Sequence, residues 1–183
     1  HSFPTRRSSD LNAIEVDRFL YNPQVRDKMR QQYHLEGKHV IGHVGRFMAQ
    51  KNHTFLLDVF AAYKKEDKDA YLVLLGDGEL METVKNKAKE LGVADSVLFV
   101  GNVGNANEWY QAFDVFMLPS IWEGLPVVGV EAQAADLQCI FSDNVTKEIG
   151  LSDKASFLSL QKSSEIIDIM VCQYSYLHKV FSP

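Results

Sequence analysis

The chain has 183 residues, of which 46% are hydrophobic and 23% are charged, and its formal net charge is -5 at pH 7. This composition supplies enough apolar material for one hydrophobic core and excludes a disordered tail, a collagen-like repeat and a disulfide-stabilised miniprotein. The acidic balance also excludes a domain-wide basic surface for nucleic acid, so an anionic ligand would need a local cluster of positive groups.

The two ends of the chain differ from its middle. Residues 1–10 have neither the apolar core of a signal peptide nor a helix or strand period, and we interpret them as a disordered or non-native leader. Residues 163–183 include a candidate helix from Ile166 to Val171, but we interpret this segment as a non-native tail. No apolar run reaches the roughly 18–20 residues of a membrane span. We expect a cytoplasmic protein with Cys139 and Cys172 buried and reduced.

Between these ends, short apolar runs alternate with amphipathic stretches. Asn22 and Asn52 each precede such a stretch and are expected to cap a helix, because an asparagine side chain accepts hydrogen bonds from free backbone amides. We expect strands over 38–44, 70–75, 97–100, 115–118, 137–141 and 157–160. We expect helices over 23–34, 52–63, 80–91, 106–113 and 126–135.

The apolar runs are continuous, which is typical of strands that are buried on both faces. We therefore predict an α/β fold, a Rossmann-like parallel sheet with helices on both faces, over residues 38–162, preceded by a linker and short helix over 11–37. Ligands of such sheets bind at the carboxyl ends of the strands. Those ends are the loops that begin at Gly45, Gly76, Gly101 and Pro119.

The first candidate site follows the strand at 38–44. Arg46 lies in the sequence Gly45-Arg46-Phe47, and Lys51 lies just before the next helix. Two cations that converge at a strand-to-helix loop can neutralise a phosphate or a diphosphate. From the spacing alone, two solvated surface charges are an equally good interpretation.

The second candidate site is the loop Pro119–Pro126. Pro126 opens a helix whose free backbone amides and positive dipole end attract an anion. Glu123 lies in the loop and Glu131 lies eight positions later on the helix. A carboxylate near a helix start can simply compensate the dipole, but two carboxylates can also accept hydrogen bonds from pairs of sugar hydroxyls. The combination favours a sugar-phosphate ligand.

Other patterns point to structure more than to chemistry. Asp67-Lys68-Asp69 matches an Asp-x-Asp metal pattern, but it lies at the edge opposite the expected ligand edge, and we interpret it as a solvated turn. Gly76-Asp77-Gly78 is expected to be a structural turn, and His43 is expected to be packed or partly exposed. The dinucleotide fingerprint, the phosphate loop and the Gly-x-Ser-x-Gly elbow are missing from the sequence.

Several segments together are similar to one family, the glycosyl transferases group 1, also known as family-4 glycosyltransferases, in its carboxyl-terminal, donor-binding domain. They are Gly42–Phe47 with Gln50–Asn52, Leu74–Leu80, Asp114–Ser120 and Glu123–Ala132, the last of which contains the Glu-x7-Glu pair of the family. The resemblance covers about Leu11 to Leu160 and implies one half of a two-domain GT-B architecture. Glu131–Ala135 and Val145–Glu148 are most similar to bacterial members that build exopolysaccharide or capsule.

The resemblance implies a hexosyltransferase that moves a sugar from a nucleotide-sugar to a glycan or a lipid-linked sugar with retention of configuration. A UDP-sugar is the expected donor, and no cofactor or metal is expected. The acceptor would bind through a missing amino-terminal domain, so this fragment is expected to be inactive alone. The parent enzyme is expected to be cytoplasmic and peripheral at the inner face of the membrane.

The resemblance also implies residue roles. Arg46 and Lys51 would hold the diphosphate and stabilise its charge as it leaves, and Glu123 would contact the donor sugar, which makes these three the catalytic set. Glu131 would bind the ribose hydroxyls, and the loop at Val103, after Asn102, would lie by the base. The backbone around the helix start would help to bind sugar and phosphate, at Gly124, Leu125, Pro126 and Val127.

Two departures from the family stand out. Asp136 lies where the family often has a glycine after the key helix, and Asp tolerates the left-handed conformation at a cost of up to ~1 kcal/mol. The family's carboxyl-terminal helix is not recognisable after about Ser163.

Two alternative functions stay open at this point. One is a module that binds a nucleotide-sugar or nucleotide and has no chemistry of its own. The other is a two-domain sugar-nucleotide epimerase, which the Glu-x7-Glu pair disfavours.

Overall fold

Six parallel strands form one sheet in the order β3-β2-β1-β4-β5-β6 in this computed structural model, which describes residues 14–161 and 165–170. The strands are β1 (His39–Val44), β2 (Ala70–Leu75), β3 (Val97–Gly101), β4 (Val115–Leu118), β5 (Gln138–Ser142) and β6 (Ala155–Leu158). Every neighbouring pair runs parallel, which confirms the predicted fold class. The expectations for residues 1–10 and for Cys172 to Pro183 lie outside the described residues.

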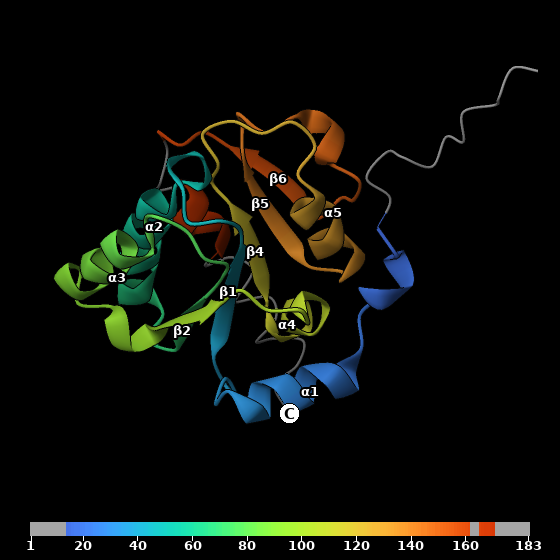
Figure 1. The fold of residues 1–183 in the computed structure, drawn as a ribbon, viewed down its shortest axis with the longest axis horizontal. Helices are drawn as coiled ribbons and strands as arrows, with labels where there is room; N and C mark the ends of the chain where they lie inside the picture. Colours follow the sequence, from blue (N-terminus) through green and yellow to red (C-terminus); the bar gives the residue numbers. More distant parts are fainter. Residues whose placement is uncertain (1–13, 162–164, 171–183) are drawn as a thin grey trace, which may run out of the picture.

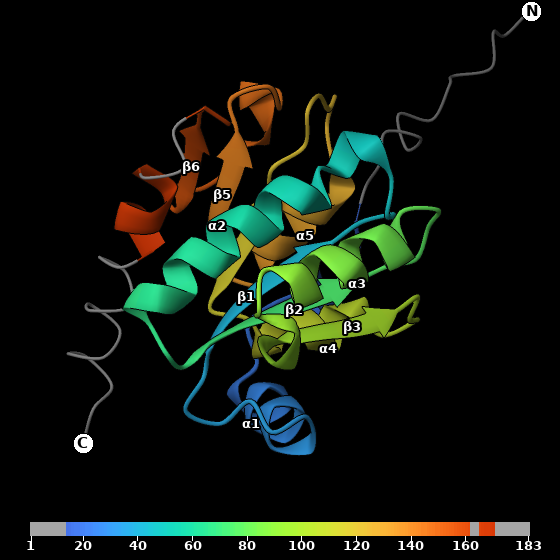
Figure 2. The same ribbon diagram turned by 90° about the vertical axis from the view of Figure 1, so that its left-hand side faces the viewer.

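Helices cover both faces of the sheet, as predicted (Figures 1 and 2). The helices are α1 (Pro23–Gln32), α2 (His53–Glu66), α3 (Met81–Glu90), α4 (Ala106–Ala112) and α5 (Val127–Ala134). Single 3-10 turns lie at Val16–Arg18, Ala49–Lys51, Ala94–Ser96 and Lys147–Ile149. Residues 165–170 are also helical. Across the described residues, no helix combines the length and apolar character needed to cross a bilayer.

The two faces of the sheet have separate hydrophobic cores. One core joins the sheet to α2 and α3 through buried side chains such as Leu56, Phe60 and Val84, and the other joins it to α1, α4 and α5. The second core requires a glycine in β1, because a Cβ atom at Gly42 would lie 2.0 Å from the ring of Phe113. Both cores pack against the sheet from whose carboxyl edge the candidate loops extend.

Several details of the predicted elements are wrong. The helix α1 ends at Gln32 rather than at residue 34, and α2 extends to Glu66 rather than ending at residue 63. Asn22 caps α1 as expected, but the side chain of Asn52 does not cap α2, because Asn52 adopts φ 55° and its amide turns to another loop. The last strand begins two residues earlier than expected, at Ala155. Asp136 adopts φ 62°, the left-handed conformation anticipated at this position.

Burial suppresses the chemistry of Cys139. The side chain lies on β5 inside the core, as predicted, and burial raises the pKa of its thiol to about 12. The thiol therefore stays protonated and unreactive at neutral pH.

Candidate functional site

The site is organised by the point where the strand order reverses. β1 and β4 are neighbours in the sheet, and the chain leaves them in opposite directions, which is the place where sheets of this kind bind ligands. The loop after β1 contains Arg46 and Lys51, and the loop after β4 contains Glu123. Sequence reasoning placed these residues in separate loops, and the strand order explains why the two loops are adjacent.

Three hydrogen bonds tie the two loops together. The amide of Ile121 donates to the carbonyl of Gln50 (2.8 Å), and the Gln50 side-chain amide donates to the carbonyl of Trp122 (2.9 Å). The Asn52 side chain, expected to cap α2, donates instead to the carbonyl of Pro119 (3.2 Å). These bonds fix the loop after β4 relative to the start of α2.

An ion pair between Lys51 and Glu123 joins the loop after β1 to the loop after β4. Lys51 Nζ donates to Glu123 Oε1, and the two side chains are only 15% and 11% exposed. The same oxygen accepts a hydrogen bond from the Ser120 hydroxyl (3.1 Å), and Ser120 is fully buried. Both functional groups are thereby held at defined positions between β1 and β4.

Arg46 lines a pocket at the carboxyl ends of β1, β2 and β3. The pocket has a volume of about 320 Å³. Arg46 itself is largely exposed and pairs with Glu79 at 3.5 Å, so each of the two predicted cations has its own carboxylate partner. The pocket is lined by Val44, Gly45, Arg46, Leu75, Gly76, Asp77, Gly101, Asn102, Val103 and Ala106. Val103, predicted to lie by a base, is therefore part of the pocket wall.

The glycine turn after β2 shapes this pocket, which agrees with its expected structural role. Gly76 adopts φ 127°, and a Cβ atom there would lie 2.1 Å from the carbonyl oxygen of Gly45. A Cβ atom at Gly78 would lie 2.5 Å from the carbonyl oxygen of Phe47. The turn can therefore pack directly against the loop that contains Arg46 only because neither residue has a side chain.

Glu131 lies on α5 and is held by α4. Its Oε2 accepts a hydrogen bond from the hydroxyl of Tyr110 at 2.8 Å. Burial, together with the nearby Glu131 carboxylate, raises the pKa of Tyr110 well above its usual value, so the phenol remains a donor. Nothing in the sequence pointed to Tyr110, because its partner lies 21 positions away on another helix.

The start of α5 provides backbone donors. Pro126 occupies the N-cap position, and none of the described side chains caps the helix. The leading amides of the helix thus have no side-chain cap, and binding of an anion by the segment after Gly124 and Leu125 stays a prediction. Val127 is the first helical residue.

Two buried histidines lie behind Lys51. His43 Nδ1 donates to the carbonyl of Met117 (2.8 Å), which leaves Nε2 unprotonated, and the His53 ring lies 4.6 Å from the His43 ring. Burial, with a smaller contribution from the nearby Lys51 charge, lowers the pKa of His43 to about 4 and that of His53 to about 2. Both rings are therefore neutral at physiological pH. His43 is fully packed, one of the two states anticipated for it.

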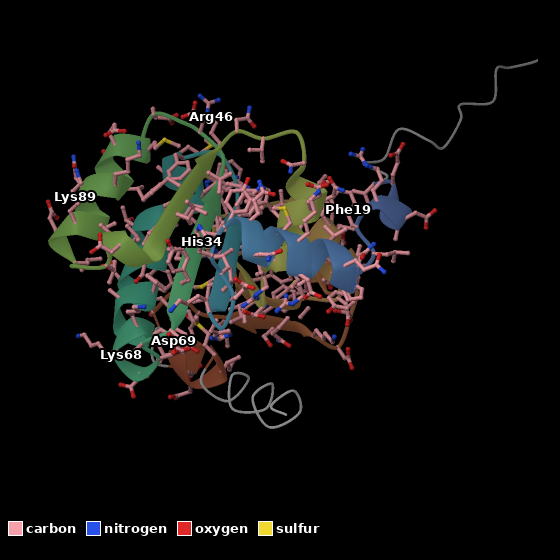
Figure 3. The ribbon with its side chains drawn as sticks, turned by 90° about the horizontal axis from the view of Figure 1, so that it is seen from below. Phe19, His34, Arg46, Lys68, Asp69 and Lys89 are labelled. Carbon is pink, nitrogen blue, oxygen red and sulfur yellow. The ribbon has the colours of Figure 1, made fainter. Side chains whose placement is uncertain are left out.

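The Asp67-Lys68-Asp69 segment lies far from Arg46, at the opposite edge of the sheet (Figure 3). Asp69 pairs with Lys38 at 2.9 Å. Asp67 is buried and accepts a hydrogen bond from Tyr63 at 3.1 Å, so the prediction of a solvated turn is wrong for Asp67. In the part of the chain that the structure describes, no three His, Cys, Asp or Glu side chains cluster as a metal site would require.

Comparison with protein families identifies the chain. The family described as "Glycosyl transferases group 1" matches residues 25–165. The chain belongs to this family. Among curated group 1 relatives, it is 40% identical over 139 residues to a putative glycosyltransferase, EpsF, of Bacillus subtilis, covering 75% of this chain and 36% of the relative. It is 38% identical over 151 residues to the Vi polysaccharide biosynthesis protein VipC/TviE of Salmonella typhi, covering 74% and 26%. The chain thus spans about a third of the first relative's length and about a quarter of the second's.

Solved structures of glycosyltransferases share the fold. The Anabaena protein Alr3699/HepE in complex with UDP-glucose superposes with a TM-score of 0.82 at 20% identity, over 91% of this chain and 47% of that one. The C-terminal domain of LpcC, a group 1 family protein from Francisella tularensis, superposes with a TM-score of 0.78 at 21% identity, over 89% and 88%. The predicted resemblance to one half of a GT-B glycosyltransferase, its carboxyl-terminal domain, is confirmed.

Proposed function

We propose that this chain is the nucleotide-sugar-binding half of a retaining hexosyltransferase that acts in exopolysaccharide or capsule biosynthesis, with a UDP-sugar as donor. The observation that supports it best is the Lys51–Glu123 pair, which places a cation and a carboxylate together at the switch point of the sheet. A nucleotide-sugar is a ligand that needs both, because its diphosphate is anionic and its sugar offers hydroxyl donors. The complex of HepE with UDP-glucose, a protein of the same fold, supports this choice of ligand.

The proposed placement of the donor uses the pocket, which Arg46 and Val103 line, and the neighbouring loop after β4. The diphosphate would lie between Arg46 and Lys51, where two cations and the amides at the start of α5 would stabilise developing negative charge. The sugar would lie against Glu123, the ribose against Glu131, and the base near Val103. We propose that no metal is needed, because these groups supply the positive charge that a metal would otherwise provide.

Calorimetric titration of the chain with UDP tests this placement. Arg46→Ala should weaken binding about tenfold, because it removes a charge-assisted hydrogen bond that is partly exposed to water. Glu131→Ala should weaken binding as well. Lys89→Ala is the matched control, since Lys89 is an exposed cation on α3, well away from Arg46 (Figure 3), and it should leave the affinity unchanged. A folded chain that binds no nucleoside diphosphate at millimolar concentration would refute the assignment.

A second experiment separates a transferase from a module that only binds. The segment is joined to a matching amino-terminal domain, and sugar transfer from a range of UDP-sugars is measured together with the anomeric configuration of the product. The proposal expects transfer with retention that a chelator does not inhibit. Absence of transfer by a folded two-domain protein would favour the binding-only function, and strong inhibition by the chelator would overturn the metal-free mechanism.

A further inference from the structure

Glu123 is the ion-pair partner of Lys51. The Lys51–Glu123 pair is largely buried, whereas Arg46 and Glu79 are 69% and 57% exposed and their nearest atoms are 3.5 Å apart. Water screens the exposed pair strongly and the buried pair weakly. Of the two cations in the proposed diphosphate site, Lys51 is therefore the one whose charge is neutralised by the protein itself.

Further contacts hold both side chains of this pair in place. Lys51 packs over the backbone of Gly45, where an added Cβ atom would lie 3.2 Å from Lys51 Cδ and 3.3 Å from Cε. Glu123 Oε1 is held by Ser120, and Glu123 also forms a parallel bridge with Val145. A phosphate that approaches Lys51 must therefore share the ammonium group with the carboxylate or replace the carboxylate.

We propose that Glu123 is a specificity-determining residue that competes with a bound nucleoside diphosphate for Lys51, so that the site holds the spent nucleoside diphosphate less tightly than its cations alone would. The inference rests on the proposed function, since it presumes that the diphosphate lies at Lys51. A nucleoside diphosphate that takes up Lys51 leaves the Glu123 carboxylate in a poorly solvated place beside its own negative charge, and this opposes binding.

The donor escapes much of this penalty because it brings its own hydroxyl groups. Glu123 Oε2 accepts no hydrogen bond from the described residues, so a sugar hydroxyl can donate to it. A nucleotide-sugar thus satisfies the carboxylate that its diphosphate draws away from Lys51. Once the sugar has been transferred, the product lacks those hydroxyls, and the Glu123 carboxylate again competes with the diphosphate for Lys51, which favours product release.

The inference predicts that Glu123→Gln tightens the binding of UDP, the opposite of what removing a simple binding residue would do. Glutamine keeps the shape and the hydrogen bond to Ser120 but leaves the charge of Lys51 uncompensated. We expect the dissociation constant for UDP to fall about three- to tenfold. This effect lies between the small coupling of exposed ion pairs and the larger coupling of desolvated ones. Calorimetry at low ionic strength measures it, and thermal unfolding confirms that the variant is folded. Glu123→Ala, measured in the same way, should shift the affinity in the same direction.

A matched control and a mutant cycle separate direct competition from a general change of charge. Glu79→Gln removes one negative charge next to Arg46, but from an exposed pair, and should change UDP affinity less than about twofold. In a Lys51→Met background, Glu123→Gln should lose most of its tightening effect, because the cation under competition is gone.

Each outcome decides between the claims. Tightening that requires Lys51 supports the inference. If the wild-type chain binds UDP and Glu123→Gln weakens binding or leaves it unchanged, or tightens it equally without Lys51, then Glu123 does not compete and the proposed function still stands. If the folded wild-type chain binds no UDP at millimolar concentration, the proposed function itself fails.

Discussion

Asp114→Asn is expected to destabilise the fold strongly, because this carboxylate joins α1 to the start of β1 and β4. Its Oδ2 accepts a hydrogen bond from the amide of Val40 at 2.7 Å and pairs with Arg30 at 3.1 Å, and its Oδ1 pairs with Arg26. The carboxylate is 10% exposed. Both arginines also donate to backbone carbonyls at the end of α4, so the network connects three elements.

The size of the effect follows from this burial. Removing one partner of a buried ion pair costs about 3–5 kcal/mol, because the remaining charges stay desolvated. Asparagine keeps one acceptor oxygen, and the Arg26 side chain is 23% exposed, so water compensates part of the loss. We expect a loss of about 3 kcal/mol, which corresponds to a fall in Tm of roughly 6–12 °C for a domain of this size.

The loss should also depend on pH. Burial alone would raise the pKa of Asp114, but the charges of Arg30 and Arg26 and the amide of Val40 outweigh burial and lower it. A carboxyl whose folded-state pKa is lowered stabilises the fold fully above its unfolded pKa, about 3.9, and loses that contribution as the pH falls through the folded value. The stability gap between wild type and Asp114→Asn should therefore be constant above about pH 5 and narrow below about pH 4.

Urea denaturation from neutral pH down to the acid limit of the fold measures both effects. Asp58→Asn is the control, because Asp58 pairs with Lys87 at 2.6 Å on an exposed face, and such pairs contribute less than about 1 kcal/mol. Equal effects of the two substitutions at neutral pH, or a gap that widens as the pH falls, would refute the role assigned to Asp114.

Three further predictions follow from other contacts. Gly76→Ala should destabilise the fold by about 2–4 kcal/mol, because the added Cβ atom would clash with the backbone. Gly92 has φ 69° and open space around it, so Gly92→Ala should cost only about 1 kcal/mol. Chemical denaturation compares the two variants, and similar losses of stability would refute the close approach at Gly76. Tyr110→Phe removes the hydrogen bond to Glu131 and should weaken UDP binding several-fold by calorimetry with little change in Tm; unchanged affinity would show that Glu131 needs no positioning. With the other cysteine replaced by serine, the buried Cys139 thiol should react with a disulfide reagent at neutral pH only at the rate of unfolding, and fast labelling of the folded chain would contradict its burial.

Much of the fold could be predicted because its signals are local. Continuous apolar runs ended by glycine give β1 and β2 nearly at their exact bounds, and Asn22 caps α1 as its side-chain chemistry suggests. Asn52 was misjudged because a cap is recognised from the next few residues, whereas the acceptor of its side chain, the carbonyl of Pro119, lies 67 positions away.

The positions of the candidate residues agree with the sequence, whereas their partners do not follow from it. Arg46, Lys51 and Glu123 lie in the loops at strand ends where the sequence predicts them, and their binding roles stay predictions. The pairing of Lys51 with Glu123 joins residues 72 positions apart. That pairing depends on the strand order, in which β4 lies beside β1 on one side while β2 and β3 lie on the other side. The hydrogen bond that Ser120 donates to Glu123, by contrast, is local, because the two residues lie three positions apart in one loop.

The most direct test of the account is a crystal structure of this chain grown with UDP-glucose. In that structure the diphosphate should lie against Arg46 and Lys51, the glucose against Glu123 and the ribose against Glu131. A nucleotide bound elsewhere, or a diphosphate that contacts neither cation, would contradict it.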